Sequence, residues 1–589
     1  MKKSIVSKLL AVSIVASMLV GCGAANETAP AMATEANNDY SAPDVVYEEP
    51  ACEAAPAYEE TAPATEDAGA APAQKVASVK ATEAANTYAE VEEAYVDGYY
   101  DEYYEPYMDE GETYSSLNET GFTSVAKNPL STFAADVDTA SYSNFRRFVT
   151  YGYRLGDFPA DALRSEEMIN YFTYDYAKPK KGEIFGVDAQ ISDCPWNEEA
   201  KLMILGVNTK EMSEAKRPNS NIVFLVDVSG SMSDYNKLPL IQQSMDMLMD
   251  QFDEDDRISI VTYASGVEVK LDGVSGDKKS KIMRAFNKLN ASGSTNGGDG
   301  IKLAYKVAEE NFIEGGVNRI IICSDGDFNV GLTSQSELED LITEKKESGV
   351  FLSVLGFGMY NYSDTTMETL ADCGNGNYAY IDTLAEAKKV LVDEMMKNFV
   401  AVAKDVKLQV EFNPALVDSY RLVGYENRAL AAEDFTDDTK DGGELGAGHQ
   451  VTVVYEIIMA EDAKTTSDLK YQDTTVSKKG EAKDEYCTLS IAYKDIDKDT
   501  SKYLDFPINA KNYTKNPSDN FVFASSVAEA SLALRDSDYL VDVTPEEAVE
   551  DIIDNLEDMD LDEYQEEFVD LLSATLDGTG YEYNYYYAY

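Results

Sequence analysis

A short run of oxygen-bearing side chains follows an apolar stretch in the middle of the chain, in VFLVDVSGSMS at residues 223–233. Asp227, Ser229 and Ser231 are spaced two residues apart, so in an extended segment their side chains point the same way. Two further oxygen donors are Thr295 in ASGSTNGGDG and Asp325 at the end of RIIICSDGD. Two carboxylates and three hydroxyls make a hard, oxygen-only ligand set, which suits Mg²⁺ better than zinc.

The elements that must bring these residues together lie between residues 219 and 401. The helical period after the DxSxS run is seen in Leu238, Ile241, Met245, Leu248 and Phe252. Similar helical stretches separate apolar strand candidates at 221–227, 257–264, 319–325, 351–358 and 377–382. This alternation predicts an α/β fold with a doubly wound, mostly parallel sheet. Such sheets bind ligands beyond the carboxyl ends of their strands, which is where Asp227 and Asp325 fall.

The five residues match, in order, the metal-ion-dependent adhesion site (MIDAS) of von Willebrand factor type A (VWA) domains. Longer stretches, such as LSTFAADVDTASYSNFRRF, CPWN and FNPALVDSYRLVGYENRAL, resemble bacterial VWA lipoproteins with a family-specific N-terminal segment and a C-terminal domain of unknown function. The resemblance covers about residues 128–575. It implies that Ser229, Ser231 and Thr295 hold Mg²⁺ (or Mn²⁺) directly or nearly so, and that Asp227 and Asp325 often act through water. It also implies that an Asp or Glu carboxylate of a partner protein completes the metal shell.

The N-terminus is predicted to be a targeting segment. MKKSIVSKLLAVSIVASMLVGCG has three lysines, a short apolar stretch and then Leu19-Val20-Gly21-Cys22. It resembles a bacterial lipoprotein signal, which implies that residues 1–22 are the signal and that Cys22 is lipidated. We therefore expect the protein outside the cytoplasm, anchored by lipid to a bacterial membrane. A disulfide is possible in an exported protein, but the five remaining cysteines name no pair.

Composition divides the rest of the chain. Residues 23–127 are rich in Ala, Pro, Glu and Tyr with almost no aliphatic periodicity, so we expect a disordered tether there and a tail of the same character at 579–589. Its tyrosines could instead form an adhesive element. An N-terminal VWA-associated region with α+β character is expected at 128–218, the VWA domain at 219–401, and a β-rich domain with helices at 402–578.

Other readings of these motifs stay open. Asp and Ser after a strand can cap the next helix, and an empty, vestigial metal site would have the same sequence. Asp136 and Thr139 belong to a DxDxT run like that of phosphatases, but the strand that this chemistry needs before it is poor. His449 is the only histidine, and no GxSxG, HExxH or P-loop sequence is present. We therefore expect a protein that is not an enzyme.

The charge of the chain narrows the class of partner. With 49 basic and 108 acidic residues, the net charge is −59, which disfavours binding to nucleic acids. The sequence thus predicts Mg²⁺-dependent adhesion to a protein ligand. The alternative is an envelope scaffold or assembly factor whose metal site is structural or vestigial. The oligomeric state stays open.

Overall fold

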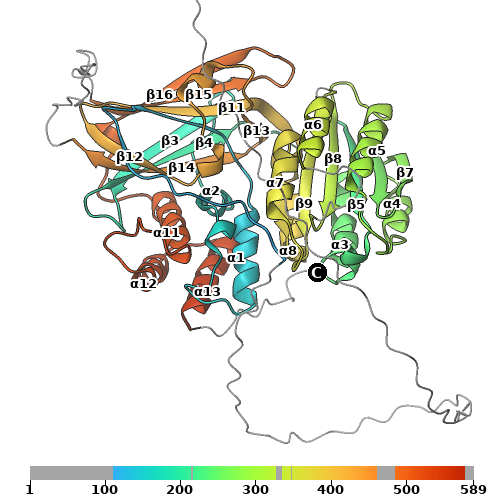
Figure 1. Cartoon of the computed structure of the whole chain (residues 1–589). Helices are drawn as coiled ribbons and strands as arrows, with labels where there is room; N and C mark the ends of the chain where they lie inside the picture. Colours follow the sequence, from blue (N-terminus) through green and yellow to red (C-terminus); the bar gives the residue numbers. More distant parts are fainter. Residues whose placement is uncertain (1–110, 214–216, 327–334, 347, 461–483, 578–589) are drawn as a thin grey trace, which may run out of the picture. The chain divides into compact units, whose positions relative to one another are not determined.

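The computed structural model describes residues 111–577, apart from 214–216, 327–334, 347 and 461–483 (Figure 1). The predicted signal with Cys22, residues 23–110 of the predicted tether and the tail at 579–589 lie outside the described residues. Among the described helices, none has the length and apolar character needed to cross a membrane. The cysteines of the described part are all free thiols, at positions Cys194, Cys323, Cys373 and Cys487.

The predicted doubly wound sheet is present. Its strand order is β10-β9-β8-β5-β6-β7, and all neighbours are parallel except β6 and β7. The antiparallel edge strand β7 was not predicted, because its sequence VEVKLDGVS is mixed in polarity and half exposed. The strands are β5 (Ser220–Asp227), β6 (Arg257–Tyr263), β7 (Val267–Ser275), β8 (Val317–Ser324), β9 (Phe351–Phe357) and β10 (Tyr378–Ile381).

Strand β5 is buried on both faces, because helices cover both sides of the sheet (Figure 1). Phe224 and its neighbours two residues away pack into one core with α3, α4 and α8. Val223 and Leu225 pack into the opposite core with α5, α6 and α7. This explains why the strand is a continuous apolar run instead of an alternating one. The helices are α3 (Leu238–Leu248), α4 (Lys279–Phe286), α5 (Gly297–Glu310), α6 (Gln335–Lys346), α7 (Asp364–Cys373), α8 (Leu384–Lys388) and α9 (Met395–Phe399).

The two regions that flank this sheet in sequence, predicted at 128–218 and 402–578, form shared sheets. One sheet has the order β1-β12-β14-β4-β3, and the other has β13-β11-β15-β16 with β2 also paired to β11. Strands from before and after the doubly wound sheet therefore hydrogen-bond to one another. The strands are β1 (Thr123–Ser124), β2 (Leu130–Ala134), β3 (Phe185–Asp193), β4 (Lys201–Thr209), β11 (Ala401–Phe412), β12 (Val417–Val423), β13 (Gly443–Gly446), β14 (Gln450–Met459), β15 (Glu485–Lys494) and β16 (Ser501–Asn509).

Strand β4 shows how this composite body is layered. Met203 and Leu205 face a core shared by the two sheets, while Leu202 and Ile204 face a core formed with helices. The helices come from both flanking regions: α1 (Ala140–Thr150), α2 (Ser165–Asn170), α11 (Asp519–Leu534), α12 (Pro545–Leu556) and α13 (Glu563–Asp577). Because one core takes residues from both ends of the folded chain, the domain built on the doubly wound sheet is inserted into a single composite body.

The structure corrects the predicted C-terminal end of the tether. Residues 111–127 are held against the folded body by backbone pairing. Thr123 pairs with Tyr420 of β12, and Thr113 forms a bridge with Ser363, just before α7. Glu112 receives two hydrogen bonds from Arg147, with the shorter N···O distance 2.6 Å. The low aliphatic content misled the prediction here, because this segment gains its order from backbone hydrogen bonds and one ion pair.

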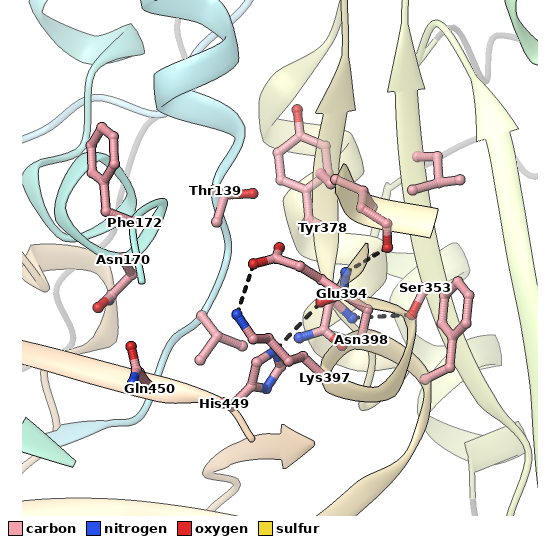
Figure 2. Close-up of a pocket in the computed structure, with 16 residues that line it drawn as sticks. Thr139, Asn170, Phe172, Ser353, Tyr378, Glu394, Lys397, Asn398, His449 and Gln450 are labelled. Atoms are coloured by element: carbon pink, nitrogen blue, oxygen red, sulfur yellow. Dashed lines mark hydrogen bonds and ion pairs between the residues drawn. The ribbon is translucent and has the colours of Figure 1, made fainter. Parts of the chain in front are cut away.

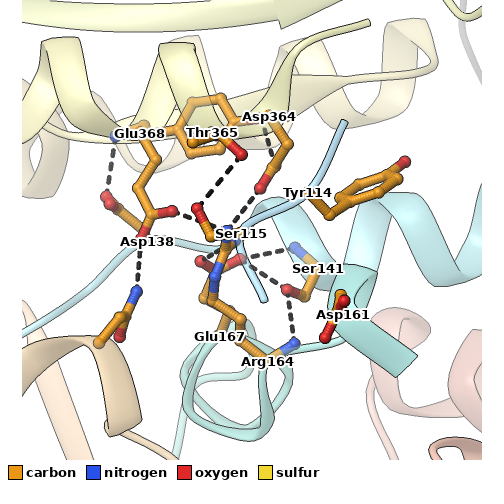
Figure 3. A network of polar contacts seen from close by, with 12 residues as sticks. Tyr114, Ser115, Asp138, Ser141, Asp161, Arg164, Glu167, Asp364, Thr365 and Glu368 are labelled. Atoms are coloured by element: carbon orange, nitrogen blue, oxygen red, sulfur yellow. Dashed lines mark hydrogen bonds and ion pairs between the residues drawn. The ribbon is translucent and has the colours of Figure 1, made fainter. Parts of the chain in front are cut away.

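A buried network of charges joins α2 to α7 (Figure 3). The Arg164 guanidinium lies 2.8 Å from Glu167, 2.5 Å from Asp364 and 2.7 Å from Glu368. All four side chains are at least nine-tenths buried. Ser141 of α1 donates to Glu167 through both its backbone amide and its hydroxyl. Because ion pairs of this kind need tight geometry, the network fixes α7, and the loop before it, against the composite body.

Candidate metal centre

Two adjacent parallel strands deliver the two candidate carboxylates. Asp227 is the last residue of β5, and Asp325 follows directly after the last residue of β8. The strands pair in register, with Val226 opposite Cys323. Ser324 then donates a hydrogen bond to Asp227 Oδ2 at 3.2 Å. Both aspartates are fully buried. The sequence prediction that they meet at one edge of the sheet matches this arrangement.

The DxSxS turn is held in place by its own backbone. Asp227 Oδ1 accepts the Ser229 amide hydrogen at 2.7 Å. The run does not stay extended as predicted, because a 3₁₀ turn covers Gly230–Ser233. The Ser229 and Ser231 hydroxyl oxygens nevertheless lie 2.9 Å apart. The predicted convergence of these two side chains is thus present, although a turn produces it instead of a strand.

Gly230 lets two loops of the candidate site approach each other closely. Its φ angle is not positive, so left-handed freedom is not what the turn requires. Its amide donates to the Gly293 carbonyl at 3.0 Å, and a Cβ at this position would lie 3.3 Å from the same oxygen. Glycine therefore allows the close approach of the loop that carries Thr295. Ser292 donates to the Val228 carbonyl at 2.7 Å and reinforces this contact.

Thr295 is buried and lies two residues beyond Gly293, just before α5. Next to it, the side-chain oxygen of Asn296 is buried and accepts no hydrogen bond in the structure. An unpaired buried acceptor is costly, and a ligand or water is the usual partner. Asp299, on the same helix, accepts a hydrogen bond from Asn296 Nδ2 and is exposed. Asp299 thus lies in the first turn of α5, on the surface.

Burial governs the protonation of Asp227. Removal from water, opposed by the Ser229 amide and reinforced by the nearby Asp325 charge, raises the pKa of Asp227 from 3.8 to about 7. A raised pKa of this size indicates that no nearby positive charge offsets the burial of the carboxylate. A divalent cation near it would favour the ionised form.

Asp325 has a cationic neighbour that sequence analysis missed. Lys237 Nζ lies 3.0 Å from Asp325 Oδ2 and 2.6 Å from Asn361 Oδ1, and Asn361 Nδ2 donates to Asp325 Oδ2 at 3.0 Å. The lysine is only 2% exposed, and it precedes α3 directly. One indication of this contact was present in the sequence: Lys237 directly precedes Leu238, the first residue of the predicted apolar helix face. Two carboxylates and one ammonium leave a single negative charge at the site.

The donor set fits a small hard cation. Adjacent oxygen ligands of an octahedral Mg²⁺, each at about 2.0–2.1 Å, lie about 2.9 Å apart. The Ser229 and Ser231 hydroxyls have this separation. The aspartate oxygens are engaged by protein donors, which agrees with ligation through water. Within the described part of the chain, no group of three or more His, Cys, Asp or Glu side chains could hold a metal, so this centre would depend on hydroxyls.

A pocket lies between the inserted sheet and the composite body (Figure 2). His449, Lys397 and Glu394 line it, together with Ser353 and Gln450. His449 Nδ1 accepts the Gly446 amide at 2.9 Å, and burial lowers the pKa of His449 to about 3. Lys397 pairs with Glu394 at 2.8 Å. The imidazole of His449 is therefore neutral near pH 7, and the charges of Lys397 and Glu394 offset each other.

The DxDxT run likewise serves structure. Asp136 accepts a hydrogen bond from Arg428 Nε at 2.7 Å, and Asp138 accepts the Tyr378 amide at 2.8 Å. Arg428 therefore joins this run to the loop after β12, and the Asp138 contact joins it to β10 of the inserted sheet. Both carboxylates are thus engaged by donors of the protein.

Three family models match the chain. Residues 221–394 match the von Willebrand factor type A domain, and residues 108–204 match a model described as von Willebrand factor. Residues 397–576 match a model described as Uncharacterized protein YfbK, C-terminal. Together they span both the inserted sheet and the composite body.

Similar proteins come from bacteria and animals. The chain is 41% identical over 434 residues to Uncharacterized protein YfbK of Escherichia coli (strain K12), covering 72% of this chain and 75% of that protein. It is 28% identical over 167 residues to Inter-alpha-trypsin inhibitor heavy chain H4 of Homo sapiens, covering 27% of this chain and 18% of that protein. Among solved structures, a von Willebrand factor type A protein from Catenulispora acidiphila is 14% identical with a TM-score of 0.38, covering 68% of this chain and 91% of that one.

Proposed function

This chain belongs to the family of bacterial von Willebrand factor type A proteins with a YfbK-type C-terminal domain, and we propose that it binds a partner protein through a divalent cation held beyond β5 and β8. The VWA domain is a protein-interaction domain. The finer claim, that Mg²⁺ or Mn²⁺ mediates the contact, is supported best by the pair of serine hydroxyls 2.9 Å apart.

Each residue of the site would have a defined task. The hydroxyls of Ser229, Ser231 and Thr295 would hold the cation, and Asp227 and Asp325 would hold and orient its water ligands. When bound, the cation would supply a coordination position for a carboxylate oxygen of the partner. Lys237 keeps Asp325 in place through its 3.0 Å ion pair. The five side chains bind and orient, and none is assigned a step that makes or breaks a bond.

Charge makes an acidic ligand the favoured one. The site's two carboxylates and the Lys237 ammonium sum to one negative charge, so a divalent cation would leave one positive charge. A positive centre on a chain of net charge −59 attracts carboxylates locally and leaves the surrounding surface repulsive to them. Selectivity would then come from the loops around the site.

We expect Ser231→Ala to weaken Mg²⁺ or Mn²⁺ binding at least about tenfold, because it removes a direct ligand. Isothermal titration calorimetry of the full chain measures this. Ser233→Ala is the matched control, since Ser233 is exposed in the same 3₁₀ turn and lies outside the ligand set. Absence of any binding heat from the parent protein in millimolar Mg²⁺ and Mn²⁺ would rule out the metal-dependent function.

A scaffold role is the second candidate, and the Lys237 contact favours it. An ammonium that already neutralises Asp325 could keep the loops in order without a metal. In that case, partner capture from the organism's surface fraction would be the same in Mg²⁺ and in chelator. Metal-dependent adhesion instead requires that chelator abolish capture while thermal stability stays unchanged.

We also propose a lipid anchor at Cys22, supported by the lysines and the apolar stretch before it. Cys22→Ser is expected to move the protein from the membrane fraction to the soluble extracytoplasmic fraction, because serine lacks the thiol to which the lipid would be attached. Cys52→Ser is the control. Equal membrane retention of parent and Cys22→Ser in fractionated cells would contradict the anchor.

A further inference from the structure

Three exposed tyrosines gather beside the candidate metal centre. Tyr151 at the end of α1 is 47% exposed, Tyr235 beyond the DxSxS turn is 70% exposed, and Tyr360 before α7 is 53% exposed. The Tyr151 and Tyr235 hydroxyl oxygens lie 3.4 Å apart. Among the described residues, one further tyrosine is similarly exposed, Tyr503 on β16. We call these three residues the tyrosine rim.

The tyrosine rim borders Asp325. Tyr360 directly precedes Asn361, whose amide donates to Asp325, and Tyr235 lies two residues before Lys237, which pairs with the same carboxylate. Exposed aromatic side chains beside a charged centre are typical of interface anchors, because they combine apolar area with a hydrogen-bonding group. The rim is therefore a surface for a ligand that carries both aromatic and acidic groups.

The described chain begins at this surface. Glu112 Oε1 accepts the Tyr360 amide at 3.1 Å. Thr113 donates to the Tyr362 carbonyl and accepts the Asp364 amide, each at 3.0 Å. Figure 3 shows the next residues, Tyr114 and Ser115, lying close to Asp364 and Thr365. Whatever precedes residue 111 is consequently tethered next to the rim.

That preceding segment has the chemistry that the surface requires. Residues 99–110 read YYDEYYEPYMDE, with five carboxylates and five tyrosines in twelve positions. Glu105 lies seven residues before Glu112, and an extended chain covers about 24 Å over seven residues. The segment can thus reach back across the rim to the metal centre.

We propose that residues 99–110 dock on the tyrosine rim of their own chain and place a carboxylate at the open coordination position of the bound cation. The inference rests on the proposed metal-dependent function and names the occupant of the site in the resting protein. A short connection gives the segment an effective concentration in the millimolar range. An external acidic ligand must displace it, so partner binding would be weakened until the segment is drawn away.

The test neutralises the segment in the full-length protein. The variant D101N/E102Q/E105Q/D109N/E110Q removes its five carboxylates. The control E53Q/E59Q/E60Q/E66Q/D67N removes five carboxylates from a more distant part of the predicted tether. The probe is a fluorescein-labelled synthetic peptide of residues 97–112. Its binding is followed by fluorescence anisotropy in millimolar Mg²⁺ and in chelator, and Mg²⁺ uptake is measured by calorimetry.

Self-occupation predicts that the peptide binds the neutralised variant about three- to tenfold more tightly than it binds the parent or the control, and only with Mg²⁺. Adding Y151A/Y235A to the neutralised variant should lower peptide affinity, whereas Y503A should not. Equal affinities for all three proteins, or no peptide binding to any, would overturn the inference while leaving Mg²⁺ uptake intact. No Mg²⁺ uptake by the parent would instead reject the proposed function itself.

Other occupants give distinct results. If deletion of residues 578–589 frees the site and neutralisation of 99–110 does not, the C-terminal tail is the occupant and the inference is wrong. If Mg²⁺ produces dimers of the parent in analytical ultracentrifugation and the neutralised variant stays monomeric, the segment acts on a second copy. That outcome would overturn the assignment to its own chain.

Discussion

Replacing Arg164 with methionine is expected to lower the free energy of unfolding by about 3–5 kcal/mol. The guanidinium contacts Glu167, Asp364 and Glu368 at 2.5–2.8 Å, and all of these groups are buried. Methionine keeps much of the arginine's apolar stem, so the loss reports charge and hydrogen bonding more than packing. Urea unfolding at pH 8 measures it.

The loss of unfolding free energy caused by Arg164→Met should depend on pH. Burial raises the pKa of both Glu167 and Glu368, and Arg164 acts in the opposite direction by favouring their ionised forms. Without the arginine, the pKa of these carboxyls would rise further. At low pH they would then be protonated and uncharged, so their burial would cost less. We therefore expect a smaller loss at pH 5 than at pH 8.

Arg284→Met is the matched control, because Arg284 is exposed on α4. It should change the free energy of unfolding by less than about 0.5 kcal/mol. If Arg164→Met is as mild as Arg284→Met at pH 8, the network does not fix α7 against the composite body. The position of the loop that carries Tyr360 and Asn361 would then need another explanation.

Asparagine at position 227 is expected to stabilise the metal-free protein above pH 7, by up to about 4 kcal/mol. The bound for this effect comes from the pKa of Asp227, which burial raises from 3.8 to about 7. Each pKa unit is worth about 1.4 kcal/mol. Asparagine keeps an acceptor for the Ser229 amide, and the Ser324 hydroxyl can turn to accept from its NH₂ group.

The sign of this effect follows from which form the fold prefers. The folded protein favours protonated Asp227, so the parent keeps its full stability below pH 3.8 and loses it as the pH rises to about 7. Asparagine cannot ionise and escapes this loss. The advantage of Asp227→Asn should therefore be near zero at pH 4 and largest at pH 8, as measured by urea unfolding in chelator.

Metal should reverse the order of stabilities. A cation that binds only the folded parent stabilises it by mass action, whereas Asp227→Asn would lack the carboxylate that supports binding. Asp234→Asn, an exposed neighbour in the same loop, is the control and should be neutral in both conditions. If Asp227→Asn is less stable than the parent in chelator at pH 8, the buried carboxylate contributes to the metal-free fold instead of straining it.

Much of the inserted domain could be predicted from the sequence. Strand β5 was recognised because both of its faces are buried, which makes the strand a continuous apolar run. Helix α3 was recognised because one face is buried, which gives Leu238, Ile241 and Met245 their helical spacing. The ends of β5 and β8 then located Asp227 and Asp325, since parallel strands place their carboxyl ends at one edge.

The limits of this reasoning are visible at the same site. The pairing of Lys237 with Asp325 joins residues 88 positions apart, and no local period encodes it. The tyrosine rim joins α1 to two loops of the VWA domain, and Tyr151 is 84 positions from Tyr235. The lysine contact lies within the inserted domain, whereas the Tyr151 contact depends on how the composite body packs against that domain.

The sequence by itself determined the α/β alternation and the order of the candidate ligands, because burial on one or two faces leaves a regular trace along the chain. Only the tertiary structure decided that residues 128–218 and 402–578 form one body, that residues 111–127 belong to it, and which charges meet beside Asp325. Pairing between distant strands and ion pairs between distant loops leave no such trace, since each partner satisfies its local rules alone.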